Sequence, residues 1–97
     1  MQHSEKETEQ VSAVFKALSN PVRLRILSII SETKRPLHIK AVAKNLKMDY
    51  AAVYRHVRVL KEAGVLQIYD VGRSRVLSPL HIDELGKLLE LARHVKR

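Results

Sequence analysis

IKAVAKNLKMDYAAVYRH, from Ile39 to His56, predicts two short helices joined by a tight turn. Apolar residues recur at helical spacing from about Lys40 to Leu46, and again after Asp49. Residues 47–49 form the turn between them, and the Asp49 side chain can accept a hydrogen bond from the first turn of the next helix. This segment is therefore predicted to be a helix-turn-helix.

The second helix of this pair is predicted to run from Tyr50 to Ala63. Its buried stripe consists of Val53, Val57 and Leu60. Gly64 follows directly and suits the left-handed backbone conformation with which many helices end. The opposite face of the helix carries polar and aromatic side chains, so we expect that face to be exposed.

After Gly64 the apolar period changes from helical to two. Leu66 and Ile68 alternate with more polar neighbours, which is typical of a strand. Residues 71–74 contain a glycine that permits a tight turn, and residues 75–77 form the second strand after it. This pattern predicts a β-hairpin with a basic tip. Pro79 is predicted to open a last helix, which continues to about Val95.

Two further helices are predicted before the helix-turn-helix. The first, from Glu5 to Leu18, carries an apolar stripe at helical spacing. The second begins with Asn20 as N-cap and Pro21 in the first helical position, and it continues to about Thr33. Residues 37–39 form a short extended piece. The fold class is mainly α with a small β-hairpin, in the order α-α-β-α-α-β-β-α, which is that of a winged helix-turn-helix.

Length and charge limit the number of domains and the class of partner. The 97 residues fit a single domain, 1–97. Lys and Arg number 18 against 10 Asp and Glu, and most of the surplus lies between residues 21 and 64. A basic surplus concentrated in one segment favours a polyanionic partner. The alternative is a basic surface that only keeps the protein in solution, and composition alone does not decide between them.

What the sequence lacks narrows the classes of function. There is no cysteine, so disulfides, thiolate metal sites and cysteine nucleophiles are excluded. Neither a run of about eighteen apolar residues nor a secretory signal at Met1–Gln10 is found, so we expect a cytoplasmic protein without membrane contact. No glycine-rich phosphate loop, H-E-x-x-H or nucleophile-elbow pattern occurs, so we do not expect an enzyme.

Two segments carry a family resemblance: FKALSNPVRLRIL at residues 15–27 and YRHVRVLKEAGVL at residues 54–66. The first is similar to the second-helix signature of ArsR-type transcriptional repressors, and the second resembles their recognition helix and the start of their wing. The resemblance covers about Val11 to His94. It implies a homodimer, held together by residues 1–18 and 79–97, that binds a palindromic operator. The expected dimer interface contains Val11, Val14, Phe15, Leu85, Leu88, Leu89, Ala92 and Val95.

The first turns of a recognition helix enter the major groove most deeply. The base-edge candidates on its outward face are Tyr50, Ala51, Tyr54 and Arg55. Arg55 can form paired hydrogen bonds with guanine, each such pair contributing about 1–3 kcal/mol of discrimination. Arg58 either contacts DNA or pairs with Glu62, four residues along the helix. The tyrosines either contact the groove or shield the turn, and His56 is either structural or a phosphate contact.

Phosphate contacts require only positive charge and reach. The candidates from the third helix, the turn and the loop before them are Lys34, Arg35, Lys40, Lys44 and Lys47. At the hairpin tip, Arg73, Ser74 and Arg75 are expected to contact the DNA backbone or the minor groove. The alternative for the hairpin is a tip that is merely soluble.

A zinc site is conceivable on the last helix. The resembled family has a zinc-sensing branch whose last helix carries ligands, and His81, Asp83 and His94 stand at similar spacing here, with Asp and His exchanged. Arg97 stands where a further ligand would be, and it puts positive charge beside the site. A polar face without metal is the favoured interpretation, so no cofactor is expected.

Four functions follow from this reasoning, and a sequence-specific, homodimeric regulator that represses transcription is favoured. The first alternative is a non-specific architectural DNA-binding protein that uses the same basic face. A zinc-responsive repressor that uses the last helix is the second. The third alternative is a winged helix that serves as a protein-interaction module in a larger assembly.

Overall fold

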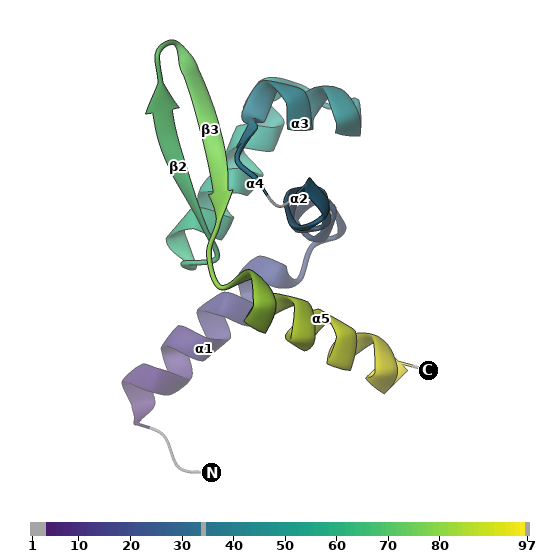
Figure 1. The fold of residues 1–97 in the computed structure, drawn as a ribbon. Coiled ribbons are helices and arrows are strands. Elements are labelled where there is room, and N and C mark those ends of the chain that lie inside the picture. The colour runs from purple at the N-terminus through teal and green to yellow at the C-terminus, as the bar shows by residue number, and fades with distance from the viewer. Residues whose placement is uncertain (1–3, 34, 97) are drawn as a thin grey trace.

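The computed structural model describes residues 4–33 and 35–96. Within these ranges, five helices and three strands follow the predicted order (Figure 1). The helices are α1 (Glu5–Leu18), α2 (Pro21–Thr33), α3 (Ile39–Leu46), α4 (Tyr50–Glu62) and α5 (Ile82–Lys96), and the strands are β1 (Leu37–His38), β2 (Leu66–Val71) and β3 (Ser74–Pro79). The predicted fold class, a mainly α winged helix-turn-helix, is confirmed.

Helix starts were predicted from capping residues, with mixed success. The Asn20 Oδ1 accepts hydrogen bonds from the backbone N–H groups of Val22 at 2.9 Å and Arg23 at 3.1 Å. These first-turn N–H groups have no partner inside α2, so the predicted N-cap is confirmed. Asp49 does occupy the N-cap position of α4, but its side chain makes no capping hydrogen bond. The prediction of that bond was wrong.

The core lies where α2, α3 and α4 meet the sheet. Its fully buried large side chains are Ile26, Ile30, Ile39, Val42, Val53, Val57, Leu60, Leu66 and Leu77. Burying one such aliphatic side chain contributes about 1.5–3 kcal/mol relative to leaving it exposed. The predicted buried stripe of α4 belongs to this set, so the core fixes which face of that helix points outward.

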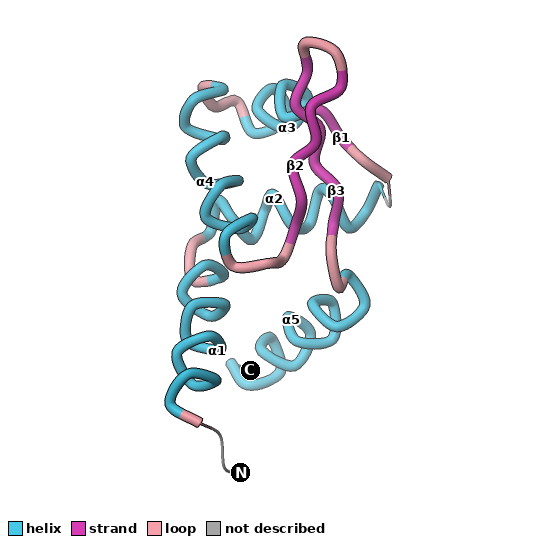
Figure 2. The backbone as a smooth tube through the Cα atoms, turned by 90° about the vertical axis from the view of Figure 1, so that its left-hand side faces the viewer, coloured by secondary structure: helices cyan, strands magenta, loops and turns pink. Residues whose placement is uncertain are grey.

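The sheet ties the hairpin to the helix-turn-helix. Its antiparallel strand order is β1-β3-β2, with Leu37 opposite Leu77 and His38 opposite Val76. The β2–β3 hairpin, residues 66–79, is the wing, and Gly72 adopts a φ of +62° in its turn. Because β1 leads directly into α3, the wing is held beside the start of that helix (Figure 2).

The start of the last helix differs from the prediction. Pro79 does not open α5; it is the last residue of β3, where it lies opposite Leu66. The backbone N–H of Leu80 then donates to the Val65 carbonyl at 3.2 Å, which extends the link between these segments. His81 takes a left-handed φ of +54° and turns the chain, so α5 begins only at Ile82. A proline is tolerated at this strand end, since it needs no ladder hydrogen bond from its nitrogen.

The two terminal helices lie on the side of the molecule away from the wing tip (Figure 1). α1 contacts α2 and α4 through its last turn, where Ala17 and Leu18 are buried. The earlier turns of α1 and the later turns of α5 are largely exposed. Across the described residues, no helix has the length and apolar character needed to span a membrane.

Candidate nucleic-acid interface

The face of α4 opposite the core is available to a partner. Val53 and Val57 are fully buried, and this orientation leaves Tyr50, Ala51 and Arg55 exposed. Arg58 and the half-buried Tyr54 complete the outward set predicted for DNA contact. The structure therefore brings all five predicted residues of this helix to one face.

The two tyrosines of α4 pack on each other and on the wing. The Tyr50 and Tyr54 rings are stacked, with centroids 6.3 Å apart and planes 14° apart. The Arg75 guanidinium of β3 lies 4.5 Å from the centre of the Tyr54 ring. The nearby Tyr50 side chain is the main cause that raises the pKa of Arg75 above its ordinary value. These contacts connect the wing to the start of α4, so Arg75 joins protein elements in addition to carrying charge.

The predicted phosphate-contacting residues lie around the same region. Lys40, Lys44 and Arg73 are exposed and line one hollow together with Tyr50 and Ser74. Lys47 is exposed in the turn between α3 and α4, where it adopts a left-handed φ of +56°. Arg35 is exposed in the loop before β1, and Lys34 lies outside the described residues. The candidates from α3 and the wing therefore lie together beside the start of α4, and Lys47 lies in the turn that precedes this helix.

His56 connects the recognition helix α4 to the α1–α2 junction. Its Nδ1 lies 3.2 Å from Arg23 Nη1, and Arg23 Nε also donates to the Ala17 carbonyl at 2.6 Å. Since a guanidinium can only donate, His56 Nδ1 accepts and the ring is neutral in this arrangement. Burial lowers the pKa of His56, and repulsion from Arg23 and Arg55 lowers it further. These contacts support the structural role among the two alternatives predicted for His56.

Arg58 makes the ion pair predicted as its alternative role. Its Nη2 lies 3.5 Å from Glu62 Oε1, and both side chains are mostly exposed. Exposed pairs of this kind contribute little, with a median of about 0–1 kcal/mol. Arg58 can therefore exchange Glu62 for a phosphate at small cost.

The three zinc candidates are not brought together within one chain. His81 and Asp83 lie at the start of α5, whereas His94 lies near its end, about 16 Å away at the helical rise per residue. The His94 Nε2 is 3.3 Å from Glu90 Oε1. Among residues 4–33 and 35–96, no group of three His, Cys, Asp or Glu side chains is placed to hold a metal. A zinc site would therefore need ligands from a second chain.

The predicted dimer residues divide into two groups. Val11 and Phe15 on α1 are 51% and 53% exposed, and Val95 on α5 is 86% exposed. The half-buried members Val14, Leu85, Leu88 and Leu89 rest partly on the core, while Ala92 is exposed. Leu91, which is 64% exposed, was missed by the sequence analysis because it falls outside the apolar stripe of α5. The signal that could have found it is its spacing of four residues from Val95, which places the two on neighbouring turns of one helix face.

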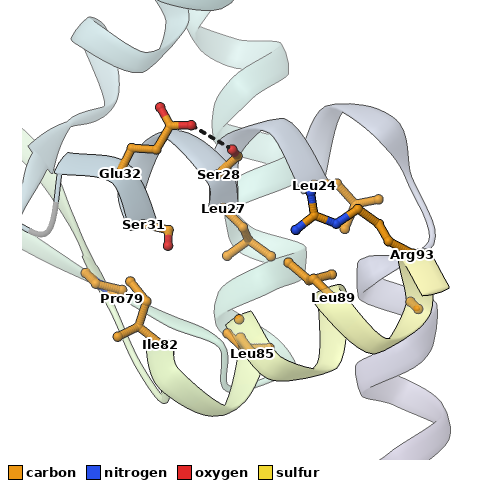
Figure 3. A pocket seen from close by; sticks show the side chains of 12 residues that line it. Leu24, Leu27, Ser28, Ser31, Glu32, Pro79, Ile82, Leu85, Leu89 and Arg93 are labelled. Atoms are coloured by element: carbon orange, nitrogen blue, oxygen red, sulfur yellow. Dashed lines mark hydrogen bonds between the residues drawn. The ribbon is translucent and has the colours of Figure 1, made fainter.

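A groove runs between α2 and α5 on this side of the molecule (Figure 3). It has a volume of about 530 Å³, and Leu27, Leu85 and Leu89 line it from the two helices. Glu32 accepts a hydrogen bond from Ser28 at 3.4 Å near one end, and Arg93 lies near the other. Leu85, Leu89 and Ala92 belong both to the groove and to the predicted dimer interface, so the groove continues the apolar surface of α5.

A helix-turn-helix with an attached wing and a cationic outward face defines a winged helix-turn-helix DNA-binding domain. Residues 18–68 match the family model described as helix-turn-helix domain. The match spans more than half of the sequence, and the chain belongs to this family.

One curated relative is similar in the same region. The uncharacterized HTH-type transcriptional regulator MJ0229 of Methanocaldococcus jannaschii is 41% identical over 51 residues, which cover 53% of this chain and 52% of the relative. The similarity thus spans about half the length of that protein.

Solved structures share the fold over nearly the whole chain. A possible transcriptional regulatory protein from Mycobacterium bovis, fragment 1–100, has a TM-score of 0.84 at 22% identity, with 97% of this chain and 98% of that chain covered. The solution structure of the same fragment, there called Mb0332, is described as a homodimeric winged helix-turn-helix DNA-binding domain of a possible ArsR-family regulator (TM-score 0.78, 23% identity, 99% and 88% covered). Rv0081 of M. tuberculosis has a TM-score of 0.76 at 27% identity, with 95% and 90% covered.

These similarities agree with the sequence resemblance. The family is that of helix-turn-helix transcription regulators, which are not enzymes. The predicted fold and the expectation that the chain is not an enzyme are confirmed. Two of the solved structures with this fold are described as an ArsR-family regulator or a possible one, which agrees with the resemblance in the sequence.

Proposed function

We propose that this chain is a sequence-specific regulator of transcription that binds double-stranded DNA as a homodimer and represses by occupying a palindromic operator. One observation carries the proposal: the start of α4 presents Tyr50, Ala51 and Arg55 outward, bordered by exposed cations of α3 and the wing. Cations that contact phosphates position the protein, and side chains at base edges read the sequence. Both kinds of residue occur here on one surface.

The homodimer is supported by the opposite side of the molecule. Phe15, Leu91 and Val95 are large apolar side chains that are more than half exposed on α1 and α5. Exposed apolar residues that gather on neighbouring elements are typical of interaction sites. The similar Mb0332 domain is described as homodimeric. A two-fold axis through these helices would give two copies of α4 that read two half-sites.

Selection of bound duplexes from a random pool tests the proposal, run with and without Zn²⁺. We expect enrichment of a sequence with two inverted half-sites whose centres lie about 10–10.5 bp or a multiple apart, one helical turn of DNA. The enriched sequence should be the same in both arms. A pool that stays random would contradict sequence-specific reading and leave the architectural function. Enrichment in only one arm would instead favour the zinc-responsive regulator, for which His94→Ala should abolish the zinc effect.

A further inference from the structure

Four cations surround one hollow between α3, the start of α4 and the wing. The hollow has a volume of about 440 Å³, much more than the roughly 30 Å³ that one liquid water occupies. Its lining consists of His38, Lys40, Ala41, Lys44, Tyr50, Arg73, Ser74 and Arg75, which we call the basic hollow. No Asp or Glu belongs to this lining, so the positive charges face each other without a carboxylate between them.

Three of these cations form no ion pair within residues 4–33 and 35–96. Arg75 is the exception, since it lies on the Tyr54 ring and its Nε is 3.9 Å from Asp70 Oδ1. Lys40 and Lys44 are one helical turn apart on α3 and repel each other, and Arg73 adds a third charge from the wing. An anion between α3 and the wing would relieve this repulsion.

The walls of the basic hollow are held in place before any ligand arrives. Pairing of His38 with Val76 fixes β3 beside the start of α3. Ile39, the first residue of α3, is fully buried and anchors that end of the helix. Arg75 and Tyr54 join the other side of the wing to α4. A site that is already arranged binds a ligand with a smaller loss of conformational freedom.

We propose that the basic hollow binds one backbone phosphate of the DNA duplex, shared between Lys40 of α3 and Arg73 of the wing. The inference rests on the proposed function, and it adds the chemical group that the basic hollow binds. A phosphodiester carries one negative charge and hydrogen-bond acceptors but no base information, so this contact fixes the register of α4 in the groove. It also refines the phosphate contact predicted for Lys40, since Arg73 of the wing would share that phosphate.

A double-mutant cycle with Lys40→Ala and Arg73→Ala tests the sharing, using the intact chain and the duplex obtained by selection. Each side chain is exposed, so the variants should unfold at the temperature of the parent chain. Each single variant should bind about tenfold more weakly, as expected for one charge-assisted hydrogen bond. Both cations contact one phosphate, so their losses should not multiply. The double variant should bind the duplex at most about threefold more weakly than the single variant that has the lower affinity. Lys6→Ala, in the first turn of α1, is the matched control and should bind normally.

A second measurement keeps the protein unchanged and alters the DNA. Neutral methylphosphonates replace the phosphates one at a time, and one position in each half-site should weaken the parent chain but not the Lys40→Ala or Arg73→Ala variant. Losses that multiply to about a hundredfold in the double variant, or different sensitive positions for the two variants, would overturn the shared site. Those outcomes leave the regulator intact. Failure of the parent chain to bind any duplex would instead overturn the proposed function.

Discussion

The two sides of this molecule expose different kinds of surface, one cationic and the other apolar. The side formed by α3, α4 and the wing carries exposed cations and a stacked pair of tyrosines, and Arg75 connects its parts. The side formed by α1 and α5 carries exposed apolar side chains, among them Phe15 and Val95, and an apolar groove. Charge without counter-charge favours a polyanionic partner, whereas an exposed apolar surface is typical of a contact with another protein.

The contrast shows how a small domain separates two tasks. The inward face of α4 packs on the core formed with α2 and α3, so one chain alone fixes which face of α4 points outward. The terminal helices contact that core only in part, and they gain most from association. A domain of this size buries a smaller share of its surface than a larger one, which favours shared burial.

The largest effect is expected from a charged substitution on the apolar side, in the predicted dimer interface. Phe15→Asp places a charge on the exposed stripe of α1, and the proposed dimer should dissociate into monomers in sedimentation equilibrium. Operator affinity should fall by about a hundredfold or more, because two linked half-site contacts become one. Val71→Asp is the matched control for sedimentation and should remain dimeric, since Val71 is also an exposed apolar residue but lies in the wing, away from α1 and α5. A Phe15→Asp chain that sediments like the parent would place the dimer interface elsewhere.

The next largest effect distinguishes residues that contact bases from residues that contact phosphates on the cationic side. Arg55→Ala should cost about 1–3 kcal/mol on the selected duplex and relax the preference at one base pair. Lys47→Ala should weaken all duplexes about equally and reduce the salt dependence of binding by about one charge. Competition titrations against single-base variants of the duplex measure both. Equal losses on every sequence from Arg55→Ala would show that Arg55 contacts phosphate.

The elements that the sequence predicted well are those with a local signal. Apolar periodicity and the Asn20-Pro21 start placed α1, α2 and α4 correctly, and the stripe of Val53, Val57 and Leu60 determined the outward face of α4. Pro79 was placed in the wrong element, because proline suits both a strand end and a helix start, and only pairing with Leu66 decides.

The candidate site was predicted as a set of residues but not as an arrangement. Charge and position along the helix or hairpin identified Tyr50, Tyr54 and Arg75 as DNA-contact candidates one by one, without indicating that they touch each other. Their contact depends on the path of the wing, which strand pairing across the chain determines. The Arg23–His56 contact was missed for the same reason, since the two residues are 33 positions apart.

A smaller effect tests whether Arg75 positions the wing or contacts a phosphate. A cation over an exposed aromatic ring contributes about 0.5–1 kcal/mol, so Arg75→Ala should weaken operator binding by roughly two- to fivefold. A positioning role predicts an unchanged salt slope and a loss that does not add to that of Tyr54→Leu. Titrations at several salt concentrations provide both readouts. A slope reduced by about one charge would identify Arg75 as a phosphate contact.

The smallest effect concerns His56. Its pKa in the folded chain is below the ordinary 6.5, so folding favours the neutral ring. Stability should therefore be greatest above about pH 6.5 and fall as the pH drops through the lowered value. Unfolding temperatures from about pH 5 to pH 8 measure this, and His56→Gln should flatten the profile. The exposed His38→Gln control should keep the dependence, and a profile unchanged by His56→Gln would assign it to other groups.

The most direct test of sequence reading by α4 is the ratio of two affinities at one salt concentration. The selected duplex and a scrambled duplex of the same length and composition are titrated with the parent chain. The account predicts that the selected duplex binds about a thousandfold more tightly or better, as specific regulators do. Equal affinities would contradict it, because charge alone would then explain the binding.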